Sequence, residues 1–442
     1  MSKIRLYTFG GYSEIGKSMS AIETDNGIVI VDMGGNMDEL IDYQTSHPNI
    51  TIQDTSELIS RNIIPNDSEF FKEKGKNVVA IVISHGHLDH AWATPFLAHK
   101  YKAPIICTPF TAEIIKKLNK DFKGERLNLK IVPTGGLINI KGIQIKLVPI
   151  THSIPQASLV LIKSQNKNIL YACDWKFDLH PLISSPVDFA ELKRLGNLGI
   201  DVLISETTRI EEKGSTFSES VAENMIEDAL IKSKDSKNIF FTTFSSHIAR
   251  LRSVIKIGRK LGRKILVIGR SIDEYFSAAI NSGVVERREL AEVIKEDRFV
   301  KKAMKRLKEG GFLVIGTGHQ GEPGSFMSKL AINHYSYALS KDDTVIFSSQ
   351  TIPTKVNIAN RSMLQNAIMD SGAKIYDNVH VSGHGSREDH KKMLELIRPK
   401  IYIPAHGGIE KQVEGIKLAQ ELNYKLNLNT FLIGDNVNFD IE

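Results

Sequence analysis

The sequence has little of what secreted or membrane proteins depend on. Its 442 residues include two cysteines, Cys107 and Cys173, which are too few for a disulfide framework. No apolar run approaches the roughly 20 residues that a membrane-spanning helix needs. The first residues also lack the apolar core of a signal peptide. We therefore expect a soluble, cytoplasmic protein with no membrane partner.

The composition is otherwise ordinary for a globular protein. Hydrophobic residues make up 41% of the chain and charged residues 24%. The length allows two or three domains, each with its own core. The formal net charge of +6 is compatible with a nucleic-acid partner but does not by itself indicate one.

The most informative stretch follows a predicted strand over residues 78–83, where Val and Ile dominate. Three histidines and one aspartate come directly after Ser84, and these are side chains that zinc accepts: His85, His87, Asp89 and His90. Alternate residues of an extended loop point the same way, so His85 and His87 share one direction. Asp89 and His90 face a slightly different point. The spacing suits two neighbouring metal ions better than one.

Ligand-type residues also end other predicted strands of the first half, namely Asp32, His152, Asp174 and Glu206. Because sites in α/β folds gather at one edge of a sheet, this recurrence indicates a common site. For Asp32 two interpretations stay open: a turn residue, or a group that orients a metal-bound histidine. Residues 37–76 carry no motif, and we expect them to form a polar, irregular insertion.

From about residue 215, strands alternate with helices, which predicts a second α/β domain with a parallel sheet. Small and hydroxyl-bearing residues follow four of its strands, in stretches that begin at Phe244, Gly269, Thr317 and Ser348. Such residues cap helices, but free N–H groups at helix N-termini also bind phosphate. Their recurrence at four strand ends favours a phosphate or nucleotide path. Phe244 is a candidate for stacking on a base, whereas Phe240 is expected in the core.

The C-terminal part returns to histidine. His384 and His406 stand among small residues, where a ligand can approach the backbone. His390 stands at the start of a predicted helix, and we expect it at the surface.

Together these stretches resemble the metallo-β-lactamase superfamily and, within it, the β-CASP nucleases. The similarity is greatest to the ribonuclease J family in its short archaeal form. Residues 84–90 are typical of the superfamily, and the stretches around His384 and His406 indicate the β-CASP branch. Residues 9–17, 317–323 and 380–386 are typical of ribonuclease J. Ser18 departs from the asparagine that we expect in bacterial members.

The resemblance implies an α/β fold: a metallo-β-lactamase αββα sandwich with an inserted β-CASP α/β domain. The sandwich would take residues 1–210 and 376–442, and the insertion residues 211–375. Bacterial relatives carry a further C-terminal domain. Because this chain ends at residue 442, we expect that any homodimer would form without such a domain.

The resemblance also implies two Zn²⁺ per chain, held by seven side chains. The first ion would be bound by His85, His87 and His152, and the second by Asp89, His90 and His406. Asp174 would bridge both ions, with a hydroxide between them, and Asp32 would orient a metal-bound histidine.

Catalytic roles are implied for Asp89, Glu206 and His384. Glu206 would hold His384, which would protonate the leaving oxygen or bind the phosphate. Six residues offer N–H or hydroxyl donors for substrate phosphate: Ser245, Ser246, Ser348, Gly383, Gly385 and Ser386.

The implied function is hydrolysis of single-stranded RNA from 5′ to 3′ by metal-hydroxide attack, with preference for a 5′-monophosphate. Alternatives are an RNA endonuclease of the mRNA 3′-end-processing type and a DNA-processing β-CASP nuclease. His406 favours RNA over DNA, because the DNA-processing relatives typically lack this last histidine. A small-molecule hydrolase would not need the insertion, and the seven ligand residues argue against a metal-free RNA-binding protein.

Overall fold

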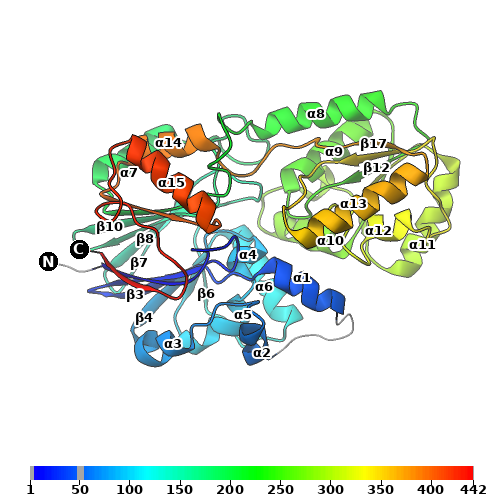
Figure 1. Cartoon of the computed structure of the whole chain (residues 1–442). Coiled ribbons are helices and arrows are strands. Elements are labelled where there is room, and N and C mark those ends of the chain that lie inside the picture. The colour runs from blue at the N-terminus through cyan, green and yellow to red at the C-terminus, as the bar shows by residue number, and fades with distance from the viewer. Residues whose placement is uncertain (1–3, 47–53, 442) are drawn as a thin grey trace. The chain divides into compact units, whose positions relative to one another are not determined.

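The computed structural model describes residues 4–46 and 54–441. The chain forms two compact units (Figure 1). The first unit comprises Met1–Leu179, Ser184–Thr216 and Gly383–Glu442, and the second comprises His180–Ile183 and Phe217–Ser382. The expected domain bounds at residues 210 and 375 stay a prediction.

A seven-stranded sheet forms one layer of the first unit, in the order β19-β1-β2-β3-β4-β5-β6. Its strands are β1 (Ile4–Gly10), β2 (Met19–Thr24), β3 (Gly27–Val31), β4 (Val78–Val82), β5 (Ile105–Cys107), β6 (Leu129–Ile131) and β19 (Asn438–Ile441). β2 and β3 pair antiparallel across a tight turn. β4 delivers the histidine-rich loop to the end of this sheet.

A six-stranded sheet forms the second layer, in the order β18-β11-β10-β9-β8-β7. Its strands are β7 (Leu137–Ile140), β8 (Ile143–Pro149), β9 (Ser158–Ser164), β10 (Lys167–Ala172), β11 (Val202–Glu206) and β18 (Ile401–Ala405). β10, β11 and β18 run parallel to one another. Their carboxyl ends therefore meet at one edge, where Glu206 ends β11 and Asp174 and His406 follow β10 and β18.

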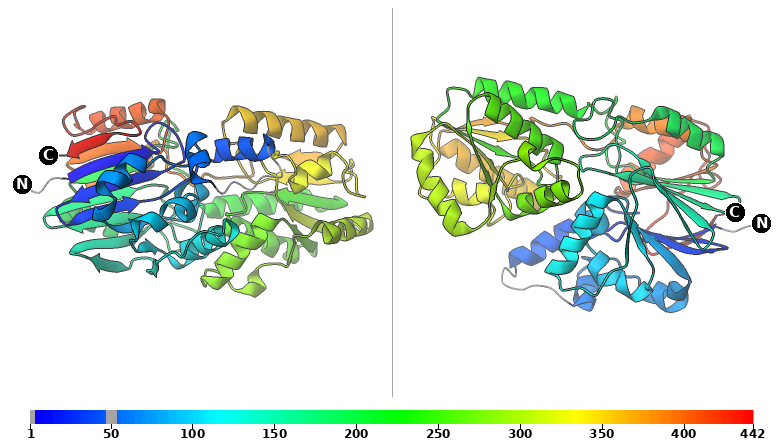
Figure 2. Two further views of the ribbon diagram at one scale, coloured as in Figure 1. Left: turned by 90° about the horizontal axis from the view of Figure 1, so that it is seen from below. Right: turned by 180° about the vertical axis from the view of Figure 1, so that it is seen from behind.

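Two apolar clusters hold these layers together. One combines Val29 and Val82 of the first sheet with Ile145 and Ile204 of the second, so it lies between the sheets. The other packs the second sheet against three helices: α7 (Phe189–Leu198), α14 (Arg387–Ile397) and α15 (Ile409–Glu421). Figures 1 and 2 show further helices outside the first sheet, including α4 (Leu88–Ala91), α5 (Thr94–Leu97) and α6 (Pro109–Asp121). The expected αββα sandwich is confirmed.

The expectation of an irregular insertion over residues 37–76 is wrong. The described part of this segment forms three helices, α1 (Met37–Ser46), α2 (Thr55–Ser60) and α3 (Ser68–Lys74). Asp54 caps α2 by accepting from Ser56 N–H at 2.8 Å. Leu58 and Phe70 are buried, so a few apolar side chains anchor helices that are otherwise polar.

The second unit is built on a six-stranded sheet in the order β14-β13-β15-β12-β16-β17, and all its neighbours pair in parallel. Its strands are β12 (Asn238–Thr242), β13 (Lys264–Ile268), β14 (Val293–Ile294), β15 (Phe312–Gly316), β16 (Thr344–Phe347) and β17 (Lys374–Tyr376). Its helices are α8 (Glu219–Lys232), α9 (Ile248–Lys260), α10 (Arg270–Asn281), α11 (Asp297–Arg306), α12 (Phe326–Ala331) and α13 (Lys355–Asp370). The predicted α/β domain with a parallel sheet is confirmed.

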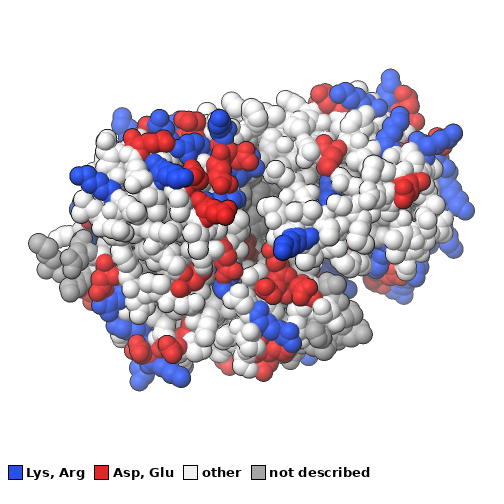
Figure 3. All heavy atoms as spheres, viewed as in Figure 1, with Lys and Arg blue, Asp and Glu red and all other residues white. Residues whose placement is uncertain are grey.

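Two further observations concern the surface. No helix within residues 4–46 or 54–441 combines the length and the apolar character needed to cross a bilayer. In the view of Figure 3, basic and acidic side chains are interspersed, so the net positive charge is not gathered on this face.

Candidate metal centre and catalytic site

The candidate ligands come from loops that follow strands of both sheets in the first unit. The segment after β4 supplies four of them, His85 and His87 before α4 and Asp89 and His90 within it, and β8, β10 and β18 are each followed by one more. Asp174 lies among the histidines, and its two carboxylate oxygens face different groups of side chains.

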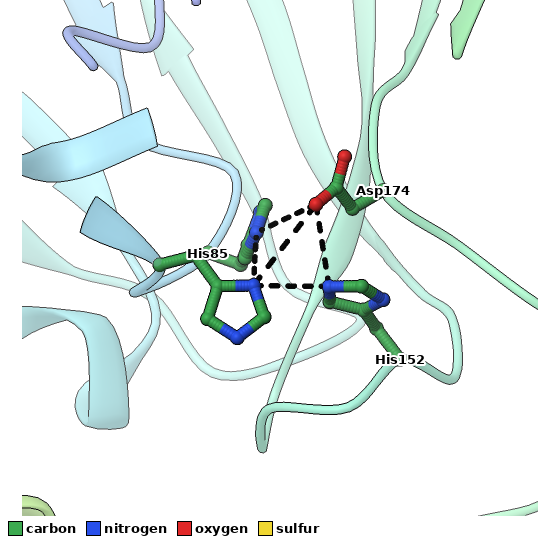
Figure 4. Close-up of side chains that lie close together, drawn as sticks. His85, His152 and Asp174 are labelled. Carbon is green, nitrogen blue, oxygen red and sulfur yellow. Dashed lines mark hydrogen bonds and ion pairs between the residues drawn. The ribbon is translucent and has the colours of Figure 1, made fainter. Parts of the chain in front are cut away.

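The first group surrounds Asp174 Oδ2. His85 Nε2 lies 3.5 Å from this oxygen and His152 Nε2 lies 3.3 Å from it. Figure 4 shows His85, His152 and Asp174 pointing toward one another. His87 Nδ1 lies 3.2 Å from His85 Nε2 and 3.0 Å from His152 Nε2. Ring nitrogens that converge in this way suit a shared cation.

The second group surrounds Asp174 Oδ1. His90 Nε2 lies 3.5 Å and His406 Nε2 lies 3.3 Å from this oxygen. Asp89 Oδ2 lies 3.5 Å from both histidine nitrogens. Cys173 also belongs to this group, although the sequence patterns gave it no role.

The donor chemistry fits divalent metal ions. Imidazole nitrogens and carboxylate oxygens are zinc ligands. Burial lowers the pKa of His85 well below its usual range and that of His87 to about 4, so both rings are neutral at pH 7 and offer lone pairs. Burial disfavours the charged form of Asp174, but neighbouring His406 and His90 hold its pKa well below the usual value. The buried Asp174 carboxylate beside the neutral rings of His85 and His87 is a natural cation site.

Asp32 contacts the histidine-rich loop at three points. Its carboxylate accepts from Ser84 N–H at 2.7 Å and from Ser84 Oγ at 2.9 Å. Its Oδ2 lies 2.9 Å from His90 Nδ1. The same residue turns the chain after β3 in a left-handed conformation, with φ of 61°. Asp32 is thus both a turn residue and the hydrogen-bond partner that orients His90 toward Asp174.

A contact at His406 was not foreseen from the sequence. Ser18 Oγ lies 2.9 Å from His406 Nδ1, and the His406 N–H donates to the Gly11 carbonyl. His406 has a φ of 47°, which is uncommon for a non-glycine residue and clusters at functional sites. The loop before β2 therefore holds His406 at both its backbone and its ring.

Close backbone approach explains one glycine of the site. A Cβ on Gly34 would lie 1.6 Å from the Asp89 carbonyl oxygen. Any side chain at residue 34 would therefore displace the loop that carries Asp89 and His90.

His384 and Glu206 form a pair beside the metal groups. His384 Nδ1 lies 2.9 Å and 3.1 Å from the two oxygens of Glu206. The Glu206 carboxylate is buried and also accepts from the N–H groups of Trp175 and Thr208, at 3.1 Å and 3.2 Å. Burial alone would lower the pKa of His384, but the charges of Glu206 and Asp174 raise it to about 9. The raised pKa favours the protonated form of His384 beside Asp174.

The expectation that His390 lies at the surface is wrong. His390 is 2% exposed, and its ring centroid lies 4.9 Å from that of Trp175. Ser386 and Asp389 form a capping box at the start of α14. This cap fixes the first turn of the helix with His390 on its inner side.

The expected phosphate-binding residues fall in both units. In the first unit, the Gly383 carbonyl lies 2.8 Å from His152 Nδ1, and Gly385 packs against Trp175. Ser386 is buried at the cap of α14. In the second unit, Ser245 Oγ lies 2.8 Å from Ser271 Oγ, while Ser246 follows β12.

Ser348 is the last of the expected phosphate-binding residues. Phe240 and Phe244 are the two aromatic residues whose roles were predicted from the sequence. Ser348 is buried, and its hydroxyl donates to the Val379 carbonyl at 2.6 Å. Phe240 is fully buried, as expected. Phe244 is half-buried and lies 4.1 Å from the His319 ring, centroid to centroid. The role of Phe244 in stacking on a base stays a prediction.

Comparisons with known proteins cover nearly the whole chain. Residues 15–203 match the metallo-beta-lactamase superfamily, residues 236–366 the ribonuclease J beta-CASP domain, and residues 370–426 the Zn-dependent metallo-hydrolase RNA specificity domain. The chain is 38% identical to the ribonuclease J of Methanocaldococcus jannaschii, across 98% of this chain and 97% of that protein. The chain belongs to the ribonuclease J family.

Other ribonuclease J family members are similar over comparable lengths. The ribonuclease J of Pyrococcus abyssi is 37% identical, across 98% of this chain and 96% of that protein. The ribonuclease J2 of Bacillus subtilis is 29% identical, across 99% of this chain and 75% of that protein. A solved structure of a protein of unknown function from Enterococcus faecalis V583 shares the fold, with a TM-score of 0.65 at 16% identity, and covers 99% of this chain and 100% of its own.

Proposed function

We propose that this chain degrades single-stranded RNA from 5′ to 3′ and prefers a 5′-monophosphate end. Membership of the ribonuclease J family makes it a metal-dependent hydrolase that acts on RNA. The observation that carries the mechanism is the position of the buried Asp174, whose two oxygens face two separate groups of ligand side chains. The direction of RNA degradation and the preference for a 5′-monophosphate end need an experimental test.

We propose two Zn²⁺ per chain. The ligands of the first would be His85, His87, His152 and Asp174, and those of the second would include Asp89, His90, His406 and Asp174. Such a metal pair polarises water and the phosphodiester, and it offsets the negative charge that develops at phosphorus. The protein's part is to hold the ligands in place, which Asp32 and Ser18 do through His90 and His406.

His384 is the proposed proton donor to the leaving oxygen. Glu206 holds its Nδ1, and its Nε2 would face the substrate. Glu206 keeps the ring protonated and fixes its direction. Asp89 places Oδ2 between His90 and His406, which leaves its second oxygen to accept a hydrogen bond from the attacking water. General acid catalysis of this kind contributes about 10²–10⁴-fold to the rate.

Each unit has its own proposed donors for substrate phosphate: Gly383, Gly385 and Ser386 in the first, and Ser245, Ser246 and Ser348 in the second. The Ser348 hydroxyl is already bonded to Val379, so this residue would act through its backbone or by supporting its neighbours. Ser245 is partly exposed, and its hydroxyl bonds only to Ser271 among the described residues. Ser245 is therefore the most suitable hydroxyl of the set.

The deciding experiment compares RNAs of one sequence that differ only in the 5′ end. We expect 5′-monophosphate RNA to be degraded fastest, with mononucleotides released from the labelled 5′ end first. Equal rates on 5′-hydroxyl RNA would disprove the phosphate contacts. A circular RNA of the same sequence should persist, and its cleavage would instead identify an endonuclease. A matched single-stranded DNA tests the DNA-processing alternative.

A further inference from the structure

The positive charge of the chain is divided unevenly between its two units. The second unit holds 25 of the 57 Lys and Arg residues but only 18 of the 51 Asp and Glu residues. The first unit is therefore close to neutral. In a protein that acts on RNA, a basic unit is a candidate for contacts with phosphate.

Three exposed lysines stand where strands of the second unit begin. Lys264 and Lys374 are the first residues of β13 and β17, and Lys237 directly precedes β12. All neighbouring strands of this sheet pair in parallel, so their first residues lie along one edge. We call this row of three lysines the amino edge.

Backbone hydrogen bonds fix the order of the row. The Lys264 N–H donates to the Gly311 carbonyl at 2.9 Å, and the Gly311 N–H donates to the Lys237 carbonyl at 2.7 Å. On the other side, the Lys237 N–H donates to the Asp342 carbonyl at 2.7 Å, and the Lys374 N–H donates to the carbonyl of the next residue at 3.0 Å. One strand separates each lysine from the next, so their backbones follow one another at intervals of about 10 Å.

Further basic side chains surround the amino edge. Arg263 donates to the Ser233 and Lys237 carbonyls, at 3.1 Å and 3.3 Å. Arg306 and Lys264 lie over the same ring, that of Phe312, at 5.6 Å and 5.1 Å from its centroid. In the adjoining loops, exposed lysines and exposed acidic residues balance one another: Lys234, Lys308 and Lys341 against Asp235, Glu309 and Asp342. The amino edge and the two arginines are therefore an excess of positive charge.

Helix dipoles do not explain the three lysines. A cation near a helix C-terminus is stabilised by the dipole, but this effect falls off within the last turn. The lysines follow the ends of α8, α9 and α13 by four or five residues, and a sheet has only a small dipole. Lys264 has an exposed partner, Glu309 at 3.4 Å, and such a pair contributes little. Within residues 4–46 and 54–441, Lys237 and Lys374 have no ion-pair partner.

We propose that the amino edge is a second surface for single-stranded RNA, which it binds through the phosphates. Phosphates would supply the missing counter-charges, and the release of salt ions from the RNA would drive binding. The two aromatic rings that contact cations here, Phe312 and Tyr337, are buried and offer no face for a base to stack on. Binding would therefore not depend on the base sequence. The inference rests on the proposed function, which supplies single-stranded RNA as the ligand.

The amino edge is distinct from the phosphate donors proposed within the same unit. Ser245 and Ser348 follow the carboxyl ends of β12 and β16, whereas the three lysines stand at the opposite ends of the strands. β12 has five residues, so its two ends lie about 15 Å apart. The amino edge would therefore hold a part of the RNA other than its 5′-phosphate.

The test compares two triple variants that lose the same charge. One is Lys237→Gln/Lys264→Gln/Lys374→Gln, and the other changes exposed lysines elsewhere: Lys193→Gln, Lys256→Gln and Lys301→Gln. Both are made in the metal-loaded full chain with His384→Ala, whose slow turnover leaves the RNA intact while binding is measured. The RNA carries a 5′-hydroxyl, so the proposed contacts to a 5′-phosphate do not contribute.

We expect the amino-edge variant to bind single-stranded RNA about 10–100-fold more weakly at about 0.1 M salt. The slope of log Kd against log salt concentration should also fall by about 2, because three phosphate contacts are lost. The control variant should keep both the affinity and the slope. The loss should be the same with oligo(A) and oligo(U), because the surface contacts phosphates.

Three results would overturn the proposal. The first is an unchanged slope in the amino-edge variant, or an equal loss in the control. The second is a loss confined to one base. The third is unchanged RNA binding with loss of polyglutamate binding, which would assign the amino edge to an acidic protein. None of these measurements depends on the direction of degradation or on the 5′ end, so this inference and the proposed function fail separately.

Discussion

At the residue scale, His384 acts beside the metal ligands without being one of them in our proposal. Its Nδ1 bonds to Glu206, and the first group retains three histidines without it. We predict that His384→Ala lowers single-turnover RNA hydrolysis by about 10²–10⁴-fold while both metals stay bound. Elemental analysis of the purified variant checks the metal content. Loss of one metal ion would instead make His384 a ligand.

Asp32 gives a second prediction at this scale, because it orients His90 through one hydrogen bond. Asp32→Asn should weaken the second metal by about 10–100-fold and leave the first unchanged, as a stepwise metal titration would show. Asp54→Asn is a matched control, since Asp54 caps α2 at an exposed position. Equal weakening of both metals would contradict the separate roles of the two groups.

Single residues differ in how far the sequence revealed them. Few residue types bind metal ions. The metal-ligand types His85, His87, Asp89 and His90 stood out because all four lie within six positions. Ser18, Cys173 and His390 were missed or misplaced, because each makes its contact with a partner far away in the chain.

At the scale of elements, a buried ion pair ties α8 to α9 in the second unit. Arg250 is fully buried and donates to both oxygens of Glu219, at 2.8 Å and 2.9 Å. It also donates to the Ser348 and Val381 carbonyls. We predict that Glu219→Gln lowers the free energy of unfolding at neutral pH by up to about 3–5 kcal/mol, because Arg250 keeps its charge without a counter-ion. Urea denaturation measures this difference.

The ion pair between Glu219 and Arg250 also predicts that the free energy of unfolding depends on pH. Burial disfavours charged Glu219, but Arg250 and His247 hold its pKa well below the usual 4.5. A carboxyl with a lowered folded-state pKa stabilises the protein above its unfolded-state pKa, and this stabilisation is lost as the pH falls toward the folded value. The stability difference between wild type and Glu219→Gln should therefore shrink below about pH 4.5. A difference that stays constant across the acidic range would disprove the coupling.

Elements with long or regular patterns were predictable, and short ones were not. The β2–β3 hairpin and the parallel sheet of the second unit follow from local alternation and from strand–helix order. α2 and α3 have six and seven residues, and isolated helices below about 12–15 residues are marginal in water. Burial of Leu58 and Phe70 anchors them, and that packing cannot be read from the local sequence.

The charged segment over residues 286–307 shows the same limit. Its α-helix runs only from Asp297 to Arg306. Val293 and Ile294 instead form β14, which pairs with Val267 and Ile268 of β13. Pairing with β13 at the edge of the sheet thus makes Val293 and Ile294 a strand.

At the scale of the whole molecule, every proposed metal ligand belongs to the first unit, as do both tryptophans, Trp92 and Trp175. Ligand binding stabilises only the folded unit that holds the ligand, by about 4 kcal/mol when the free ligand exceeds its Kd a thousandfold. Chelation should therefore lower the unfolding temperature of the first unit and leave that of the second unchanged.

Tryptophan fluorescence makes this prediction measurable, because it reports on the first unit alone. After chelation, the fluorescence transition should move to lower temperature, while part of the far-ultraviolet circular dichroism transition stays in place. Added Zn²⁺ should bring the two signals back to their starting positions. If both signals shift together by the same amount, the two units unfold as one cooperative body, and the metal stabilises the second unit through the first.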